Sequence, residues 1–256
     1  MVDEIAIRTE NLTKYFGALA AVNDVSINIK RNTLHAIIGP NGAGKTTFFN
    51  LLSGNLPPTS GKVFYGDLDL TQQPIHRMIH LGIGRSFQIT NIFPNLTVYE
   101  NIRLASQAME KGNFNFIKDP AQLKNCIQRT NEVIEQVGLQ KNALNLARNL
   151  PHGDQRKLEL GMILAPDPEI LLLDEPTAGM ASEQVPELIE LIQKIQEAGN
   201  KTVVLVEHNM NVVMSISDKI TVMHMGKILA EGKPAEIAGN KEVQTAYLGG
   251  LYELDV

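Results

Sequence analysis

Residues 39–47 read Gly39-Pro40-Asn41-Gly42-Ala43-Gly44-Lys45-Thr46-Thr47 and directly follow the apolar run Leu34-His35-Ala36-Ile37-Ile38. The spacing Gly-x-x-x-x-Gly-Lys-Thr between a strand and a helix is typical of a loop that binds phosphate. Glycines lack a Cβ, so the backbone N–H groups can approach a phosphate closely, and a helix that begins near Lys45 adds the positive end of its dipole. Lys45 can reach the β- and γ-phosphates, and Thr46 can offer its hydroxyl to Mg²⁺. A glycine-rich turn without a ligand is the alternative, but the full spacing in this setting favours a nucleoside triphosphate site.

The composition narrows the class of protein. The chain has 256 residues, of which 43% are hydrophobic, and this suits one large α/β domain or two small ones with a substantial core. A net charge of −5 argues against a dedicated nucleic-acid binder. The single cysteine, Cys126, allows no internal disulfide. The acidic start and the short apolar runs predict an intracellular chain without a signal peptide or membrane span.

The pattern of apolar residues changes twice along the chain. The first eighty residues are strand-rich: Ile5–Ile7 and Val25–Ile29 alternate like half-buried antiparallel strands, and Leu34–Ile38 reads as a strand covered on both faces. Between Thr97 and Arg148 the pattern predicts helices, over Val98–Ala105 and Ala121–Val137.

Alternation of strands and helices resumes after Pro166. Buried strands are expected at Ile170–Leu173 and Thr202–Val206, an amphipathic helix begins near Val185, and Ile220–Ala230 reads as a hairpin around Gly226. The sequence therefore predicts a nucleotide-binding α/β core that is interrupted by a mostly helical insert.

Asp174 and Glu175 follow the apolar strand Ile170–Leu173. Ligands of parallel sheets gather at the carboxyl ends of the strands, so Asp174 is expected beside the phosphate loop, where it helps to hold Mg²⁺. Glu175 is expected to face the γ-phosphate and to orient an attacking water. Taken alone, the pair is equally well explained as two solvated acids at a turn. Together with the phosphate loop, the pair is better explained as part of a nucleotide site.

Further motifs occur in the order of a known family: Phe16 before Gly17, Gln88 in Arg85-Ser86-Phe87-Gln88, the segment Leu150-Pro151-His152-Gly153-Asp154-Gln155-Arg156, and His208 in Val206-Glu207-His208. With them the chain resembles the nucleotide-binding subunit of ATP-binding cassette (ABC) transporters from about Ile5 to Gly249. The fold that this resemblance implies is α/β: a RecA-like phosphate-loop ATPase core with an N-terminal antiparallel β subdomain and an inserted helical subdomain. Residues 5–249 would form one ATP-binding domain, with its core at 5–88 and 158–249, its helical subdomain at 89–157, and a short tail at 250–256.

The resemblance also implies a role for each motif, with ATP and Mg²⁺ as cofactors. Glu175, His208 and Gln88 are expected to act in ATP hydrolysis, and Thr46, Gln88 and Asp174 to hold Mg²⁺. The nucleotide-binding residues are expected to be Phe16, Gly39, Pro40, Asn41, Gly42, Ala43, Gly44, Lys45, Thr46 and Thr47. The signature residues Pro151, His152, Gly153, Asp154 and Gln155 are expected to contact the nucleotide of the other subunit in a head-to-tail pair. An apolar core position remains the alternative for Phe16.

Two residues depart from the commonest family pattern. Pro151 stands where a serine is usual, ahead of a helix that is expected from Gln155 to about Ala165. Because proline is sterically easy at a first helical position, we expect this helix to form despite the change. Ala181 stands where the family often has an aspartate. The first change removes a hydroxyl and an N–H from the signature, and the second removes a polar group from the expected dimer contact.

Within the family, the chain looks most like the branch that imports branched-chain and other hydrophobic amino acids, through Asn95-Leu96-Thr97-Val98-Tyr99-Glu100-Asn101 and the ending Ala246-Tyr247-Leu248-Gly249. The resemblance implies a homodimer or a heterodimer with a paralogous ATPase subunit. It also implies integral membrane permease subunits, an indirect solute-binding protein, and a peripheral place on the cytoplasmic face of the inner membrane, with no nucleic acid bound. An importer of urea or short amides, a soluble ABC ATPase and a regulator without hydrolysis are the alternatives.

Overall fold

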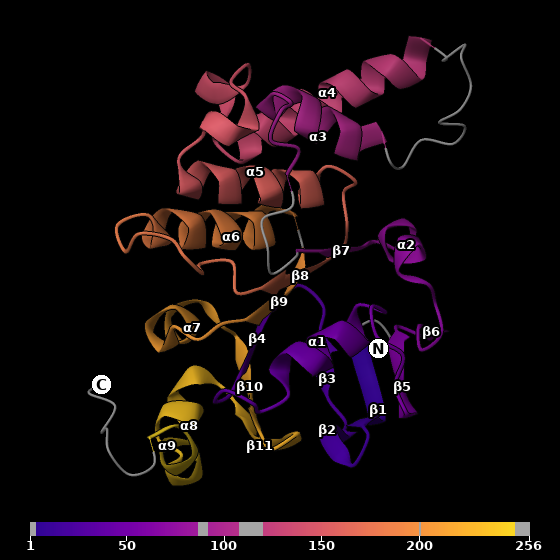
Figure 1. Cartoon of the computed structure of the whole chain (residues 1–256), viewed down its shortest axis with the longest axis vertical. Helices are drawn as coiled ribbons and strands as arrows, with labels where there is room; N and C mark the ends of the chain where they lie inside the picture. The colour runs from indigo at the N-terminus through magenta and orange to yellow at the C-terminus, as the bar shows by residue number, and fades with distance from the viewer. Residues whose placement is uncertain (1–3, 87–91, 108–119, 200, 249–256) are drawn as a thin grey trace.

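The computed structural model describes residues 4–86, 92–107, 120–199 and 201–248, and Figure 1 shows the course of the chain. The strands in this part are β1 (Ile5–Phe16), β2 (Leu19–Val25), β3 (Asn28–Lys30), β4 (Leu34–Ile38), β5 (Ser60–Tyr65), β6 (Leu68–Asp69), β7 (Ile83–Arg85), β8 (Ile170–Asp174), β9 (Thr202–Val206), β10 (Lys219–His224) and β11 (Lys227–Gly232). The helices are α1 (Lys45–Leu52), α2 (Ile75–Met78), α3 (Val98–Gln107), α4 (Pro120–Gln136), α5 (His152–Leu164), α6 (Val185–Gly199), α7 (Met210–Ile216), α8 (Pro234–Ala238) and α9 (Lys241–Leu248).

A six-stranded sheet forms the centre of the molecule, in the order β11-β10-β4-β9-β8-β7. All neighbours are parallel except β10 and β11, which form the predicted antiparallel hairpin. Every residue of β4, β8 and β9 is buried, which explains why these strands show no polar alternation. The order places the carboxyl ends of β4, β9 and β8 side by side, and the phosphate loop follows β4.

The N-terminal antiparallel sheet and α1 share one hydrophobic core with one face of the central sheet. The sheet has the order β2-β1-β5-β6, with β3 also paired to β1. The continuous strand predicted over Val25–Ile29 is wrong, because the chain leaves β2 at Val25 and re-enters at Asn28. At the break, the Thr9 hydroxyl donates to the Val25 carbonyl and accepts from the Ile27 N–H, both at 3.0 Å, in place of regular ladder bonds.

Helices α3, α4, α5 and α6 share a second core with the opposite face of the central sheet. Figure 1 shows α5 and α6 next to the sheet and α3 and α4 beyond α5, at the far end of the molecule. This arrangement confirms the predicted helical insert. Helix α5 continues through residue 157. The subdomain boundary expected between residues 157 and 158 would therefore fall within one helix, and its position stays a prediction.

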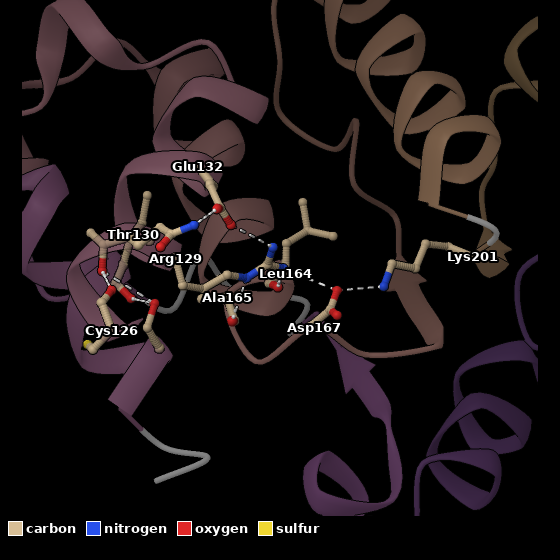
Figure 2. Close-up of polar contacts among 11 residues, drawn as sticks. Cys126, Arg129, Thr130, Glu132, Leu164, Ala165, Asp167 and Lys201 are labelled. Atoms are coloured by element: carbon tan, nitrogen blue, oxygen red, sulfur yellow. Dashed lines mark hydrogen bonds and ion pairs between the residues drawn. The ribbon is translucent and has the colours of Figure 1, made fainter. Parts of the chain in front are cut away.

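Arg129 of α4 joins the insert to the end of α5 (Figure 2). Its guanidinium donates to the carbonyl oxygens of Leu164 at 2.7 Å and Ala165 at 3.2 Å, and to the Asp167 carboxylate at 3.2 Å. Lys201 donates to the same carboxylate at 2.8 Å, from the segment before β9. Carbonyls at a helix C-terminus lack partners within the helix, so these contacts satisfy the end of α5 and fix its position. We call this set of contacts the Arg129 brace.

The fold class predicted from the sequence is confirmed: an α/β core with an antiparallel β subdomain and a helical insert. Across the described residues, none of the helices combines the length and apolar character that crossing a membrane demands.

Candidate nucleotide-binding site

The predicted phosphate loop connects β4 to α1, as its spacing requires. Gly44 adopts φ +99°, and a Cβ there would lie 2.2 Å from the Ala21 carbonyl oxygen, so only glycine fits. At Gly42, where φ is +79°, a Cβ would meet no atom of the described residues within 4 Å, so the space beside this residue is open. The loop therefore forms a cradle of backbone groups in front of the α1 N-terminus, where an anion is favoured.

Lys45 is the first residue of α1, and its side chain is buried. Its ammonium group donates to the carbonyl oxygens of Gly39 at 2.6 Å and Pro40 at 3.2 Å, so it curls back over the loop. Burial lowers the pKa of Lys45, and the carboxylates of Glu175 and Asp174 oppose this shift. The position of the ammonium group allows it to turn to a phosphate without leaving the loop.

The acid pair lies at the end of β8. Asp174 is 2% exposed, and burial, together with the charge of Glu175, raises its pKa. Its N–H donates to the Ser86 hydroxyl at 2.8 Å, whereas its Oδ1 atom is buried and has no hydrogen-bond partner among the described residues. A buried carboxylate oxygen that interacts with the charge of Lys45, the residue before the exposed Thr46, suits Mg²⁺, which is bound by one or two protein oxygens and completed by phosphates and water.

Glu175 and His208 meet at the mouth of the loop. Glu175 has the left-handed backbone value φ +48°, and its N–H donates to the Val206 carbonyl at 2.8 Å. His208 follows β9, and its Nε2 atom is in hydrogen-bond contact with Oε1 of Glu175. Parallel strands β8 and β9 pair Asp174 with Val206, so the two loops that follow them start side by side. The structure thus brings together residues 33 positions apart in the chain.

Residues 41–47 of the loop, Glu175 and His208 line one open cavity of about 860 Å³, whereas Asp174 lies behind it, beside Ser86. Phe16 lines it from the end of β1 and is 50% exposed, so the alternative that it is a core aromatic is wrong. An exposed ring at the rim offers a flat apolar surface to a base. Two further residues line the cavity but belong to no sequence motif: Leu19, at the start of β2, is 67% exposed, and Met225, in the turn between β10 and β11, is 77% exposed.

The signature segment lies elsewhere in the molecule. It opens α5, which packs on the opposite face of the central sheet from α1 (Figure 1), and the described residues that line the cavity include none of it. The predicted helix start at Gln155 is wrong: α5 begins at His152, and Pro151 is its N-cap rather than its first helical residue. The Pro151 carbonyl closes the first turn by accepting from the Gln155 N–H at 3.0 Å. One chain therefore does not complete the predicted composite site.

The remaining signature residues have local partners. The Asp154 carboxylate accepts from the side chain of Asn142 at 3.0 Å, and Gln155 donates to the Leu150 carbonyl at 3.0 Å. At Gly153 a Cβ would lie 3.1 Å from the Gln184 side chain. Gln88, predicted for catalysis and Mg²⁺ binding, lies outside the described residues.

The comparisons with known proteins agree with this geometry. Residues 22–178 match the family model of the ABC transporter, and residues 227–252 match the model of the branched-chain amino acid ATP-binding cassette transporter. The chain is 40% identical over 248 residues to the high-affinity branched-chain amino acid transport ATP-binding protein LivG of Salmonella typhimurium, covering 95% of this chain and 97% of LivG.

Solved structures show the same fold. An ATP-binding cassette of an ABC transporter has a TM-score of 0.83 at 28% identity, covering 96% of this chain and 99% of that one. A dimeric cassette in a post-hydrolysis state, bound to ADP and phosphate, has a TM-score of 0.74 at 27% identity, covering 89% and 98%.

The fold and the cavity define a phosphate-loop ATPase. The chain belongs to the ABC transporter family and is one of its ATP-binding, ATP-hydrolysing cassettes.

Proposed function

We propose that this cassette energises the uptake of branched-chain or other hydrophobic amino acids by an ABC importer. The observation that carries the nucleotide site is the single cavity shared by Phe16, the phosphate loop, Glu175 and His208. The identity to LivG over nearly the whole of both chains, together with the match of residues 227–252, supports the amino-acid cargo over urea or short amides.

In this proposal each site residue binds or orients one part of ATP or the attacking water. Phe16 holds the adenine ring, the N–H groups of residues 39–46 and the Lys45 ammonium hold the phosphates, and Glu175 orients the attacking water. His208 contacts the Glu175 carboxylate and fixes the geometry around the γ-phosphate. Bound Mg²⁺ supplies charge stabilisation to the phosphates, and Asp174 and Thr46 are the described residues that would hold it.

A second subunit completes each site in this proposal. Helix α5 begins with the signature and lies on the opposite face of the central sheet from the cavity of its own chain. In a head-to-tail pair, its N-terminus would meet the nucleotide of the partner. The ADP- and phosphate-bound relative is dimeric, which supports this arrangement. The partner is the same chain or a paralogous subunit. Permease subunits, coupled to a solute-binding protein, then hold the pair at the cytoplasmic face of the membrane.

Glu175→Gln tests the chemistry, because the amide keeps the shape of the side chain and loses its basicity. We expect ATP turnover to fall by about 10²–10⁴-fold, while ATP now stabilises a dimer that size-exclusion chromatography detects. Unchanged turnover would remove Glu175 from the role of base.

The transport role needs a separate experiment. Gentle isolation of membranes from producing cells should recover the chain with a polytopic membrane protein. A purified solute-binding protein of the same complex should bind leucine rather than urea. Failure to recover any polytopic partner contradicts the transport proposal, and preferential binding of urea contradicts the amino-acid cargo.

A further inference from the structure

Glu207 lies between the buried strand β9 and the exposed His208, and it is only 3% exposed. Burying a carboxylate is costly unless hydrogen bonds satisfy its oxygens. Among the described residues, no lysine or arginine forms an ion pair with it within 4.0 Å, so the compensation has to come from neutral donors.

Four donors supply that compensation. Oε1 accepts from the Thr177 hydroxyl at 2.6 Å and from the Thr177 N–H at 3.1 Å. Oε2 accepts from the N–H groups of His208 at 3.0 Å and Asn209 at 3.5 Å. One carboxylate therefore joins the loop after β8 to the loop after β9.

Both loops carry a group that the proposed chemistry needs. Thr177 is two residues beyond Glu175, whose backbone is held at φ +48° and whose carbonyl accepts from the Ala178 N–H at 3.0 Å. His208 directly follows Glu207. A shift of either loop moves the Glu175 carboxylate relative to the imidazole, and errors of about 1 Å in such a site can cost about a hundredfold in rate.

We propose that Glu207 is a positioning residue, whose buried carboxylate fixes the separation of Glu175 and His208. The described residues that line the cavity do not include Glu207. The inference rests on the proposed function of those two residues, and it adds a third acid to the reaction machinery through its effect on geometry. In the sequence, Glu207 stands out only as an acid between the apolar strand β9 and His208, and it belongs to none of the motifs described above.

The experiment compares Glu207→Gln with Glu100→Gln in the full-length chain. Glu100 offers a matched control, because its carboxylate also accepts from the N–H and hydroxyl of one threonine, Thr97, at 2.8 and 2.9 Å, but at the start of α3. The amide in Glu207→Gln turns one acceptor into a donor, so either the N–H groups of His208 and Asn209 or the N–H and hydroxyl of Thr177 lose their acceptor. We expect kcat for ATP to fall about tenfold or more, with KM within about threefold of wild type, because the phosphate loop and Phe16 are untouched. Glu100→Gln should keep wild-type kcat.

Two threonine variants test the same bond from the other side and remain informative if Glu207→Gln does not fold. Thr177→Val removes the hydroxyl and should lower kcat, whereas Thr177→Ser keeps it and should restore turnover. The double variant Glu207→Gln, Thr177→Val should be no slower than the slower single variant, because both remove one interaction.

Three results would overturn the inference: wild-type kcat in Glu207→Gln, an equal loss in Glu100→Gln, or a double variant whose loss is the product of the single losses. If Glu207→Gln does not fold, equal kcat in Thr177→Val and Thr177→Ser overturns it. These outcomes differ from failure of the proposed function, which appears as a wild-type chain that does not hydrolyse ATP or as full turnover in Glu175→Gln.

Discussion

Replacing Arg129 by methionine should destabilise the chain through the C-terminus of α5. The substitution keeps much of the apolar stem and removes three donated bonds, two of them to carbonyls of Leu164 and Ala165. A hydrogen bond from a charged donor contributes about 1.5–3 kcal/mol, and the 28% exposure of this side chain reduces that to about 1 kcal/mol each. The sum is about 2–3 kcal/mol. For a domain of this size it corresponds to a fall in Tm of about 5–10 °C.

Differential scanning calorimetry of the purified chain measures this effect. Lys194→Met provides the control, because its pair with Glu190 lies on the exposed surface of α6 and contributes little. Arg129→Lys should fall between wild type and Arg129→Met, since one ammonium cannot reach all three acceptors. A Tm for Arg129→Met within about 1 °C of the Lys194→Met value would refute the reasoning that the brace holds α5.

The remaining predictions concern the phosphate loop and a buried histidine. Gly44→Ala should weaken ATP binding at least about tenfold in isothermal titration, because its Cβ would collide with the Ala21 carbonyl. Gly138→Ala has a similar left-handed φ and no atom within 4 Å, so equal losses in both variants would contradict this cause. His35 is bonded to the Thr221 hydroxyl at 2.7 Å, and burial lowers its pKa to about 3 from 6.5. The unfolded chain therefore binds the extra proton first, and the free energy of unfolding should fall by about 1.4 kcal/mol per pH unit as the pH drops below about 6.5. His35→Gln should reduce that slope in urea titrations at pH 4.5–7, and an unchanged slope would exclude His35 as its source.

The parts of the fold that could be predicted from the sequence are those where burial alone sets the pattern. The strand Thr202–Val206 was predicted with its observed bounds, because a strand covered on both faces is apolar throughout. The phosphate loop was predictable because its chemistry needs fixed glycines and a lysine at fixed spacing. Both signals are local in the sequence.

Other features depend on contacts between distant residues. The break between Val25 and Asn28 is made by the Thr9 hydroxyl, and β1 extends far beyond its predicted first three residues through register shifts against β2 and β5. The start of α5 at His152 depends on the dihedral angles of Pro151, φ −55° and ψ 153°, which end the preceding segment at the proline. Hydrophobic periodicity records none of these contacts.

The same limit applies to the site. The loop, the acid pair and the histidine were identified as motifs, but only the pairing of β8 with β9 shows that Glu175 and His208 meet. The sequence marks Glu207 only as an acid between an apolar strand and His208, because its bonds to three backbone N–H groups and the Thr177 hydroxyl leave no characteristic spacing.

The order of strands in the central sheet has a consequence for how the molecule is made. Strand β4 is flanked by β9 and β10, which follow it by more than 160 residues. During synthesis on the ribosome, both edges of β4 therefore lack their partner strands until most of the chain has emerged. An apolar strand with unpaired edges is prone to pair with other chains. Both edges of β4 are paired only when residue 224 is available, and the nucleotide site is complete only after Glu175 and His208 arrive with β8 and β9.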